Sequence, residues 1–156
     1  MLLTKDDIDE NEIRQARMVH AGSVNMTKEP ARGANLYAMK TAHDNGRLVS
    51  FDVNYRDTLW ESEAACKEVA DQVYDYVDFL KISEEELYFV GGEENIPNFM
   101  KEHGISVVIE TLGADGAKYF FNGHSEHLPG HKVHAVDATG AGDAFWGGFL
   151  SKILMS

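Results

Sequence analysis

The chain has 156 residues, 44% hydrophobic and 26% charged, a composition typical of one globular domain that can bury a core. Its 14 lysines and arginines against 26 aspartates and glutamates give a formal net charge of −12, which argues against nucleic acid or an anionic membrane as partner. The single cysteine cannot form an internal disulfide, which fits a reducing compartment. No stretch is long enough to span a membrane, and the N-terminus is too acidic for a signal peptide, so we expect a cytoplasmic protein.

Hydrophobic periodicity and turn residues divide the N-terminal half into helices and strands. In chain order, the patterns predict a short helix over 4–16, a buried strand over 17–23, a helix over 27–45, a strand over 48–53 and a helix over 62–76. Thr27 is the expected cap of the second helix, with Pro30 in its first turn and Asn45-Gly46 at its end. Cys66 falls in the last of these helices, where we expect it to be buried and inert.

The C-terminal half continues the alternation. Its predicted elements are a strand over 77–82, a short helix from 83, a helix over 96–103, a strand over 105–110, a hairpin over 117–128 and a helix from about 140 to 156. Ser83 and Glu86 have the spacing of a capping box. Phe145, Trp146 and Phe149 in the last helix are interpreted as core packing.

Strands that alternate with helices predict an α/β fold with a mainly parallel sheet and helices on both faces. Ligands of such sheets bind at the C-terminal ends of the strands. Four unusual clusters follow strands at those ends: Gly22-Ser23, Asn54-Tyr55-Arg56, Ser83 to Glu86, and Thr111 to Gly116.

Each strand-end cluster has a functional and a structural interpretation. Asn54 and Arg56 could hold a phosphate or a sugar substituent, or Arg56 could pair with a neighbouring aspartate. Glu86 either serves the capping box alone or orients metal-bound water near nucleotide phosphates. Residues 111–116, with two glycines and the Thr111 hydroxyl group, either form a turn into the next strand or bind a triphosphate against their backbone.

Four histidines lie close together in the C-terminal half: His124, His127, His131 and His134. Pro129-Gly130 interrupts the segment, and the spacing is not that of a zinc site. We therefore interpret them as exposed side chains and predict no metal ligand among them.

Residues 137–145 form a glycine-rich loop that enters the last helix. Gly140 and Gly142 lack the Cβ atoms that would keep a ligand from the backbone, and amides of a first helical turn lack intrahelical partners. Such a turn can receive an anion. Asp143 would repel that anion unless it does chemistry there, as a general base for an attacking hydroxyl does. Alternatively, the glycines make an ordinary turn and Asp143 complements the helix dipole.

Residues 137–150, Asp-Ala-Thr-Gly-Ala-Gly-Asp-Ala-Phe-Trp-Gly-Gly-Phe-Leu, resemble the C-terminal signature of the ribokinase-like (PfkB) family of carbohydrate kinases. Further segments look like bacterial fructokinases: His20-Ala21-Gly22-Ser23, Glu29-Pro30-Ala31-Arg32, Phe51 to Arg56 with Leu59-Trp60, Lys81 to Leu87, and Thr111-Leu112-Gly113. The nearest competitor is 2-keto-3-deoxygluconate kinase, which shares Asn-Tyr-Arg and Leu-Trp. The resemblance implies a ribokinase-like fold and ATP-dependent phosphorylation of a sugar hydroxyl, with a small-molecule sugar and ATP as partners.

The same resemblance implies roles for individual residues. Asp143 would be the catalytic base, and the amides of Gly140, Ala141 and Gly142 would form an anion hole for the transferred phosphoryl group. The backbone around Asp137 and Thr139 resembles a monovalent-cation site, for which K⁺ is the expected ion.

The strand-end clusters also receive roles. Arg56 and Asn54 would bind the substrate, close to the sugar or the transferred phosphate. Glu86 would be linked to the Mg²⁺ environment of ATP, although Ser83 replaces the asparagine of the family's Asn-x-x-Glu element. The nucleotide phosphates would be lined by Thr111, Gly113 and Gly116.

Members of this family are roughly twice as long as the present chain. Residues 1–156 are therefore expected to form a partial kinase domain, the central to C-terminal part, without the lid and the N-terminal strands. Such a chain would be inactive as given, or a non-catalytic nucleotide-binding or interaction fragment. An unpaired sheet edge and uncovered helix faces would favour self-association or a homo-oligomer.

Overall fold

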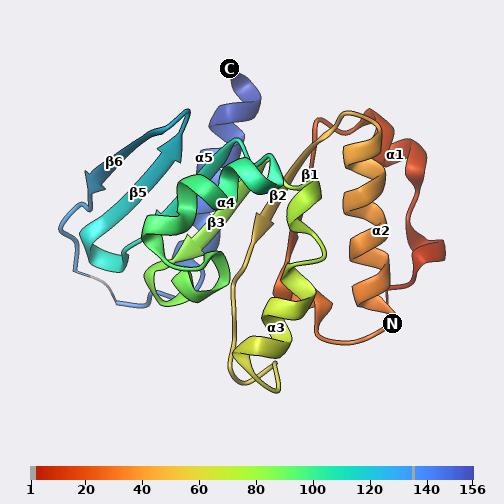
Figure 1. The fold of residues 1–156 in the computed structure, drawn as a ribbon, viewed down its shortest axis with the longest axis horizontal. Helices are drawn as coiled ribbons and strands as arrows, with labels where there is room; N and C mark the ends of the chain where they lie inside the picture. Colours follow the sequence, from red (N-terminus) through yellow and green to blue (C-terminus); the bar gives the residue numbers. More distant parts are fainter. Residues whose placement is uncertain (1–2, 135) are drawn as a thin grey trace.

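The computed structural model describes residues 3–134 and 136–156 and contains one six-stranded sheet with helices against it (Figure 1). The strands lie in sequence order: β1 (Met18–Gly22), β2 (Leu48–Asp52), β3 (Phe79–Ser83), β4 (Val107–Thr111), β5 (Gly116–Phe121) and β6 (His124–Pro129). The first four are parallel, while β5 and β6 add in antiparallel orientation. The predicted alternation is confirmed, and the sheet is mixed.

The described residues also form five α-helices and six short 3₁₀ helices. The α-helices are α1 (Glu10–Gln15), α2 (Ala31–Asp44), α3 (Glu63–Ala70), α4 (Ile96–His103) and α5 (Ala141–Met155). The 3₁₀ helices are η1 (Lys5–Asp7), η2 (Ser23–Met26), η3 (Tyr74–Tyr76), η4 (Glu84–Val90), η5 (Glu93–Asn95) and η6 (Gly113–Asp115). Within the described ranges, no helix has the length and apolar character needed to cross a bilayer.

The two faces of the sheet are covered by different helices. Because β1 to β4 advance in one direction, the crossover helices α2, α3 and α4 all lie on one face, and α5 lies on the other. Because successive strand residues point to opposite faces of the sheet, neighbouring residues of one strand belong to two separate hydrophobic cores. Val49, Leu80 and Val108 pack under α2 to α4, whereas Phe79 and Val107 pack under Trp146 and Leu150 of α5.

Three sequence predictions about helices need correction. Thr27 does not cap α2: Pro30 occupies the N-cap position and Thr27 instead ends η2. The helix predicted over 62–76 ends at Ala70, because the chain turns there to bury Val73 and the first residue of η3, Tyr74. Phe145 is 42% exposed and is not part of the core, unlike Trp146.

The hairpin of β5 and β6 turns at Asn122 and Gly123, whose positive φ angles of 49° and 75° suit a tight two-residue turn. At the other end of the hairpin, Gly116 lies so close to β6 that an added Cβ would fall 2.1 Å from the carbonyl oxygen of Leu128. That close approach places the loop before β5 against the end of β6.

Candidate active site

The face of the sheet that carries α5 changes from apolar to polar toward the C-terminal ends of the strands. Phe79 and Val107 lie under α5, and two residues further along β3 the same face presents Lys81. The neighbouring polar residues of this face are His20, Ser50, Asp52, Ser83 and Thr111. A polar floor therefore adjoins the N-terminus of α5; Ser50, Asp52 and Lys81 are buried, Ser83 and Thr111 are half-buried, and His20 is exposed.

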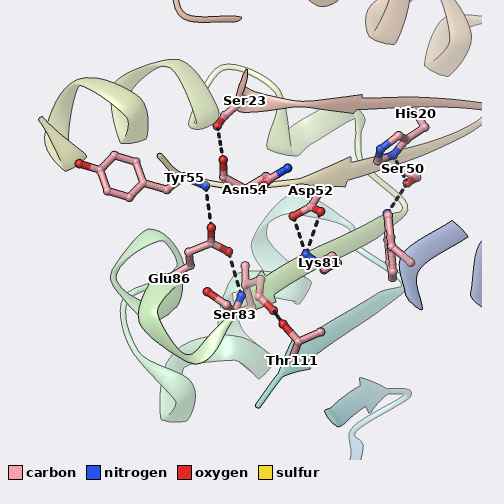
Figure 2. Close-up of polar contacts among 12 residues, drawn as sticks. His20, Ser23, Ser50, Asp52, Asn54, Tyr55, Lys81, Ser83, Glu86 and Thr111 are labelled. Carbon is pink, nitrogen blue, oxygen red and sulfur yellow. Dashed lines mark hydrogen bonds and ion pairs between the residues drawn. The ribbon is translucent and has the colours of Figure 1, made fainter. Parts of the chain in front are cut away.

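A buried ion pair occupies the middle of this floor. Lys81 Nζ donates to Asp52 Oδ2 at 2.8 Å and to Oδ1 at 3.0 Å, and the side chains are only 7% and 4% exposed (Figure 2). Buried charges are stable only when paired and hydrogen bonded, so each partner holds the other in place.

The N-terminus of α5 lies directly above this pair. A Cβ built on Gly142 would fall 3.7 Å from Lys81 Nζ, so the glycine lets the backbone approach the ammonium group. Gly140 begins the helix with a φ of 76°. Within the described chain, the amides of Gly140, Gly142 and Asp143 have no hydrogen-bond acceptor, but Ala141 donates to the Ala138 carbonyl at 3.0 Å.

Asp143 follows these amides in the first turn of α5. Its side chain is exposed and makes no hydrogen bond with any described residue. Asp143 is thus a solvent-accessible carboxylate close to amides without a described acceptor and to a buried ammonium group. This arrangement is typical of a general base beside an anion site.

Glu86 joins the ends of β2 and β3. Its Oε1 accepts the Tyr55 amide proton at 2.6 Å and its Oε2 accepts the Ser83 amide proton at 2.8 Å, and the predicted capping box is present. Burial raises the pKa of Glu86, while the two amide hydrogen bonds act in the opposite direction. Each oxygen keeps one lone pair, which fits a contact to metal-bound water more closely than direct ligation.

The segment after β2 presents the predicted substrate-binding residues. Asn54 has a φ of 42°, and Ser23 Oγ approaches its carbonyl oxygen at 3.4 Å. Arg56 is exposed, and its Nη1 donates to the Tyr55 carbonyl at 3.0 Å. Among described residues it has no carboxylate partner, and Asp52, an aspartate four residues before it, is bound to Lys81.

The cluster after β4 lies next to the end of β3. Thr111 pairs in register with Ser83, and its Oγ1 donates to the Ile82 carbonyl at 3.3 Å. Gly113 is exposed with a φ of 56°, and Gly116 closes the loop against β6. The structure thus brings 54–56, Glu86, Thr111 and the start of α5 to one edge of the sheet.

The loop before α5 contains the predicted monovalent-cation segment. Asp137 Oδ1 accepts the Thr139 amide proton at 2.8 Å, and this bond lowers the pKa of the Asp137 carboxyl group. Within 3–134 and 136–156, no three His, Cys, Asp or Glu side chains are clustered as a metal site. A Mg²⁺ ion carried by nucleotide phosphates and water would need no such cluster.

Sequence reasoning assigned no function to three residues of the polar floor: His20, Asp52 and Lys81. The available signal was one charged residue in each of two mostly apolar strands: Asp52 at the end of β2 and Lys81 at the centre of β3. Buried strands rarely carry an unpaired charge, so an aspartate and a lysine in neighbouring strands indicate a pair.

Comparison with known proteins assigns the whole chain to one group. The description "pfkB family carbohydrate kinase" matches residues 1–156. Fructokinase-1 of Zea mays is 37% identical over 158 residues, which cover 99% of this chain and 49% of the maize protein. The chain spans about half the length of the curated relatives it matches.

Solved structures agree with this assignment. One of them is a fructokinase double mutant from Vibrio cholerae O395 in a form with fructose, ADP and potassium ion bound. It is 30% identical to this chain, with a TM-score of 0.82, and the match covers 96% of this chain and 48% of that one. A putative ribokinase II from E. coli in complex with ATP and Mg²⁺ is 26% identical with a TM-score of 0.88, covering 99% of this chain and 51% of that one.

Proposed function

Since this chain belongs to the pfkB family of carbohydrate kinases, we propose that residues 1–156 carry the phosphoryl-transfer part of an ATP-dependent sugar kinase. The observation that carries the proposal is the position of Asp143 in the first turn of α5, next to amides without an acceptor among the described residues and to Gly142, which lies over Lys81 of the Asp52–Lys81 pair. Fructose is the proposed acceptor, because the most similar relatives include fructokinases; 2-keto-3-deoxygluconate is the alternative.

In the proposed reaction, the Asp143 carboxylate takes the proton of the sugar hydroxyl as its oxygen attacks the γ-phosphorus of ATP. The amides of Gly140 and Gly142, with Lys81 beneath them, stabilise negative charge on the transferred phosphoryl group. The amide of Ala141 joins them only if it leaves the Ala138 carbonyl. The bond to ADP breaks, and the sugar phosphate leaves with its proton on Asp143.

The other predicted residues support binding. Arg56 and Asn54 hold the sugar or the transferred phosphate, and Thr111, Gly113 and Gly116 approach the nucleotide phosphates. Glu86 would orient water bound to Mg²⁺, and that ion would supply charge neutralisation on the phosphates. The segment around Asp137 would hold K⁺.

A second candidate function, nucleotide binding without turnover, is favoured by the openness of the site. Asp143 and Gly142 are exposed, and two hollows of about 550 and 580 Å³ that flank the β5–β6 hairpin include neither of them. Phosphoryl transfer to a sugar needs water to be excluded, so we expect residues 1–156 to bind ATP·Mg²⁺ better than AMP but to turn over poorly.

A coupled assay of ADP formation with fructose or 2-keto-3-deoxygluconate, beside calorimetric titration with ATP·Mg²⁺ and AMP, separates these functions. Glu68, which is exposed on α3, serves as the control. Turnover supports the kinase function if Asp143→Asn abolishes it and Glu68→Gln leaves it intact. Binding of ATP·Mg²⁺ without turnover supports the second function. Absence of both, or full activity of Asp143→Asn, would contradict the proposal.

A further inference from the structure

The segment that follows β2 is held at one peptide group, which has a side-chain partner on each side. Glu86 Oε1 accepts the amide proton of Tyr55 at 2.6 Å, and Ser23 Oγ donates to the carbonyl oxygen of Asn54 at 3.4 Å (Figure 2). This N–H and this C=O belong to the same planar unit, the 54–55 peptide group. The bond to the carboxylate is short and charge-assisted, while the bond from the hydroxyl group is longer and weaker.

The two side chains that hold this peptide group are buried and lie outside the sheet. Ser23 is 1% exposed at the start of η2, directly after β1, and Glu86 is 5% exposed in η4, directly after β3. The other carboxylate oxygen of Glu86 accepts the Ser83 amide proton at 2.8 Å, so the carboxylate itself is fixed at the end of β3. The chain beyond β2 is therefore tied to the ends of both neighbouring strands.

The backbone of Asn54 has a conformation that needs such support. Its φ of 42° lies in the left-handed region, which a residue with a Cβ atom adopts only at a cost in energy. The last bond to the sheet is one residue earlier, where the Val53 amide donates to the Lys81 carbonyl at 3.1 Å, and a new turn begins at Arg56. The φ of Asn54 thus sets the direction in which the chain leaves the sheet, and with it the position of Arg56.

We propose that Glu86 and Ser23 are positioning residues, which hold the 54–55 peptide group so that Asn54 and Arg56 are both placed for the acceptor sugar. The inference rests on the proposed function, in which Asn54 and Arg56 bind the sugar or the transferred phosphate. It gives Glu86 a part that needs no metal ion, because the carboxylate acts directly on a backbone amide. Ser23 has the same part from the opposite side and carries no charge.

An NMR measurement on the unliganded chain tests the hold on the backbone without any activity. A positive φ brings the amide and Hα protons of a residue close together, so Asn54 should give a strong intraresidue NOE. Glu86→Met, which removes both carboxylate acceptors at similar volume, should weaken this NOE, and Glu86→Gln, with one oxygen for two amides, should weaken it less. Glu68→Gln should leave it unchanged.

A double variant keeps this test decisive if Glu86→Met does not fold. Ser23→Ala combined with Glu86→Gln weakens the hold from both sides without a large change in volume, and the dispersion of the other amide signals reports whether the chain is folded. We expect a clear loss of the Asn54 NOE in this variant. A wild-type NOE in the folded double variant would overturn the positioning role.

The two substrates separate positioning from a role at the nucleotide. Glu86→Gln should raise the KM for fructose by about tenfold, the change expected for loss of one charge-assisted hydrogen bond. Ser23→Ala should raise it less, and should leave the calorimetric affinity for ATP·Mg²⁺ unchanged. An unchanged KM for fructose in Ser23→Ala, or equal losses for both substrates, would contradict positioning. A wild-type chain that shows the Asn54 NOE but no turnover contradicts only the proposed kinase.

Discussion

At the scale of single residues, the ionised floor of the site is the most sensitive feature. Lys81→Met would leave Asp52 buried without its cation, and breaking one partner of a buried pair costs about 3–5 kcal/mol. We therefore expect Lys81→Met to lose most of the unfolding free energy in urea titrations. Asp52→Asn combined with Lys81→Met removes both charges and should recover most of that loss.

A surface pair supplies the control for this experiment. Lys40 and Asp44 form an exposed ion pair at 2.9 Å on α2, and such pairs contribute at most about 1 kcal/mol. Lys40→Met should leave the urea midpoint nearly unchanged. Equal effects of Lys40→Met and Lys81→Met would show that burial of the Asp52–Lys81 pair has no energetic importance.

Cys66 provides a pH-dependent prediction at the same scale. The thiol is fully buried, and burial raises its pKa from 9.0 to about 11. Between these values the unfolded chain loses the thiol proton and the folded chain keeps it, so the unfolding free energy should fall as pH rises from 9 to 11. Cys66→Ala should remove this component, which urea titrations across that pH range would measure.

Thiol reactivity checks the same point independently. At pH 8 the folded chain should react slowly with a thiol reagent such as dithionitrobenzoate and rapidly once unfolded in urea. Fast labelling of the folded chain would show that Cys66 is accessible, contrary to the structure.

The residues that sequence reasoning found and those it missed differ in a physical way. Gly140, Gly142 and Asp143 are close together in the sequence, so their spacing, together with the resemblance of residues 137–150, predicts an anion site. Asp52 and Lys81 are 29 positions apart, and only strand pairing brings them together. The hydrogen bond of the Ala141 amide was also beyond prediction, because it depends on the conformation of the loop at Ala138.

At the scale of elements, the hairpin of β5 and β6 depends on a single glycine. Gly116→Ala would place a Cβ 2.1 Å from the Leu128 carbonyl oxygen and 2.5 Å from the Gly130 nitrogen, both backbone atoms that cannot move aside. We expect a loss of more than about 2 kcal/mol, and loss of amide protection along β6 in hydrogen-exchange measurements.

Gly123→Ala is the matched variant at the other end of the hairpin. Gly123 also has a positive φ, 75°, but nothing lies within 4 Å of an added Cβ. Its cost should be limited to backbone strain of about 1 kcal/mol. If Gly116→Ala is no more destabilising than Gly123→Ala, the close approach of the loop to β6 is not present in solution.

Element types were predictable from periodicity, while some boundaries were not. α4 begins and ends where its pattern predicts, because Gly104 stops it with a φ of 72°. α3 has no such stop signal: burial of Val73 and Tyr74 shortens it, and that is a tertiary effect. The failed Thr27 cap has a similar cause, since Thr27 belongs to the preceding 3₁₀ turn.

At the scale of the whole molecule, two exposed apolar side chains of the hairpin lie on the sheet face that carries α5. Phe121 is 46% exposed and Leu128 is 51% exposed, and both lie on the same face of the hairpin as Ala117, which packs under α5. Within the described residues, β1 has β2 as its one neighbour in the sheet. Exposed apolar side chains and an unpaired strand edge both favour association with a second copy.

We therefore expect the chain to self-associate in a concentration-dependent way in sedimentation velocity experiments. Phe121→Glu combined with Leu128→Lys replaces both exposed apolar side chains with charged ones and should weaken association without loss of folding, since both side chains are already half exposed. Ser125→Lys is the control, because Ser125 is exposed on the opposite face of β6, in register with Phe120. A chain that stays monomeric from low to high micromolar concentration would contradict association, and equal weakening by Ser125→Lys would place the contact elsewhere. Residual association in the double variant would point to an edge of the sheet, β1 or β6, since each of these strands has a single neighbouring strand among the described residues.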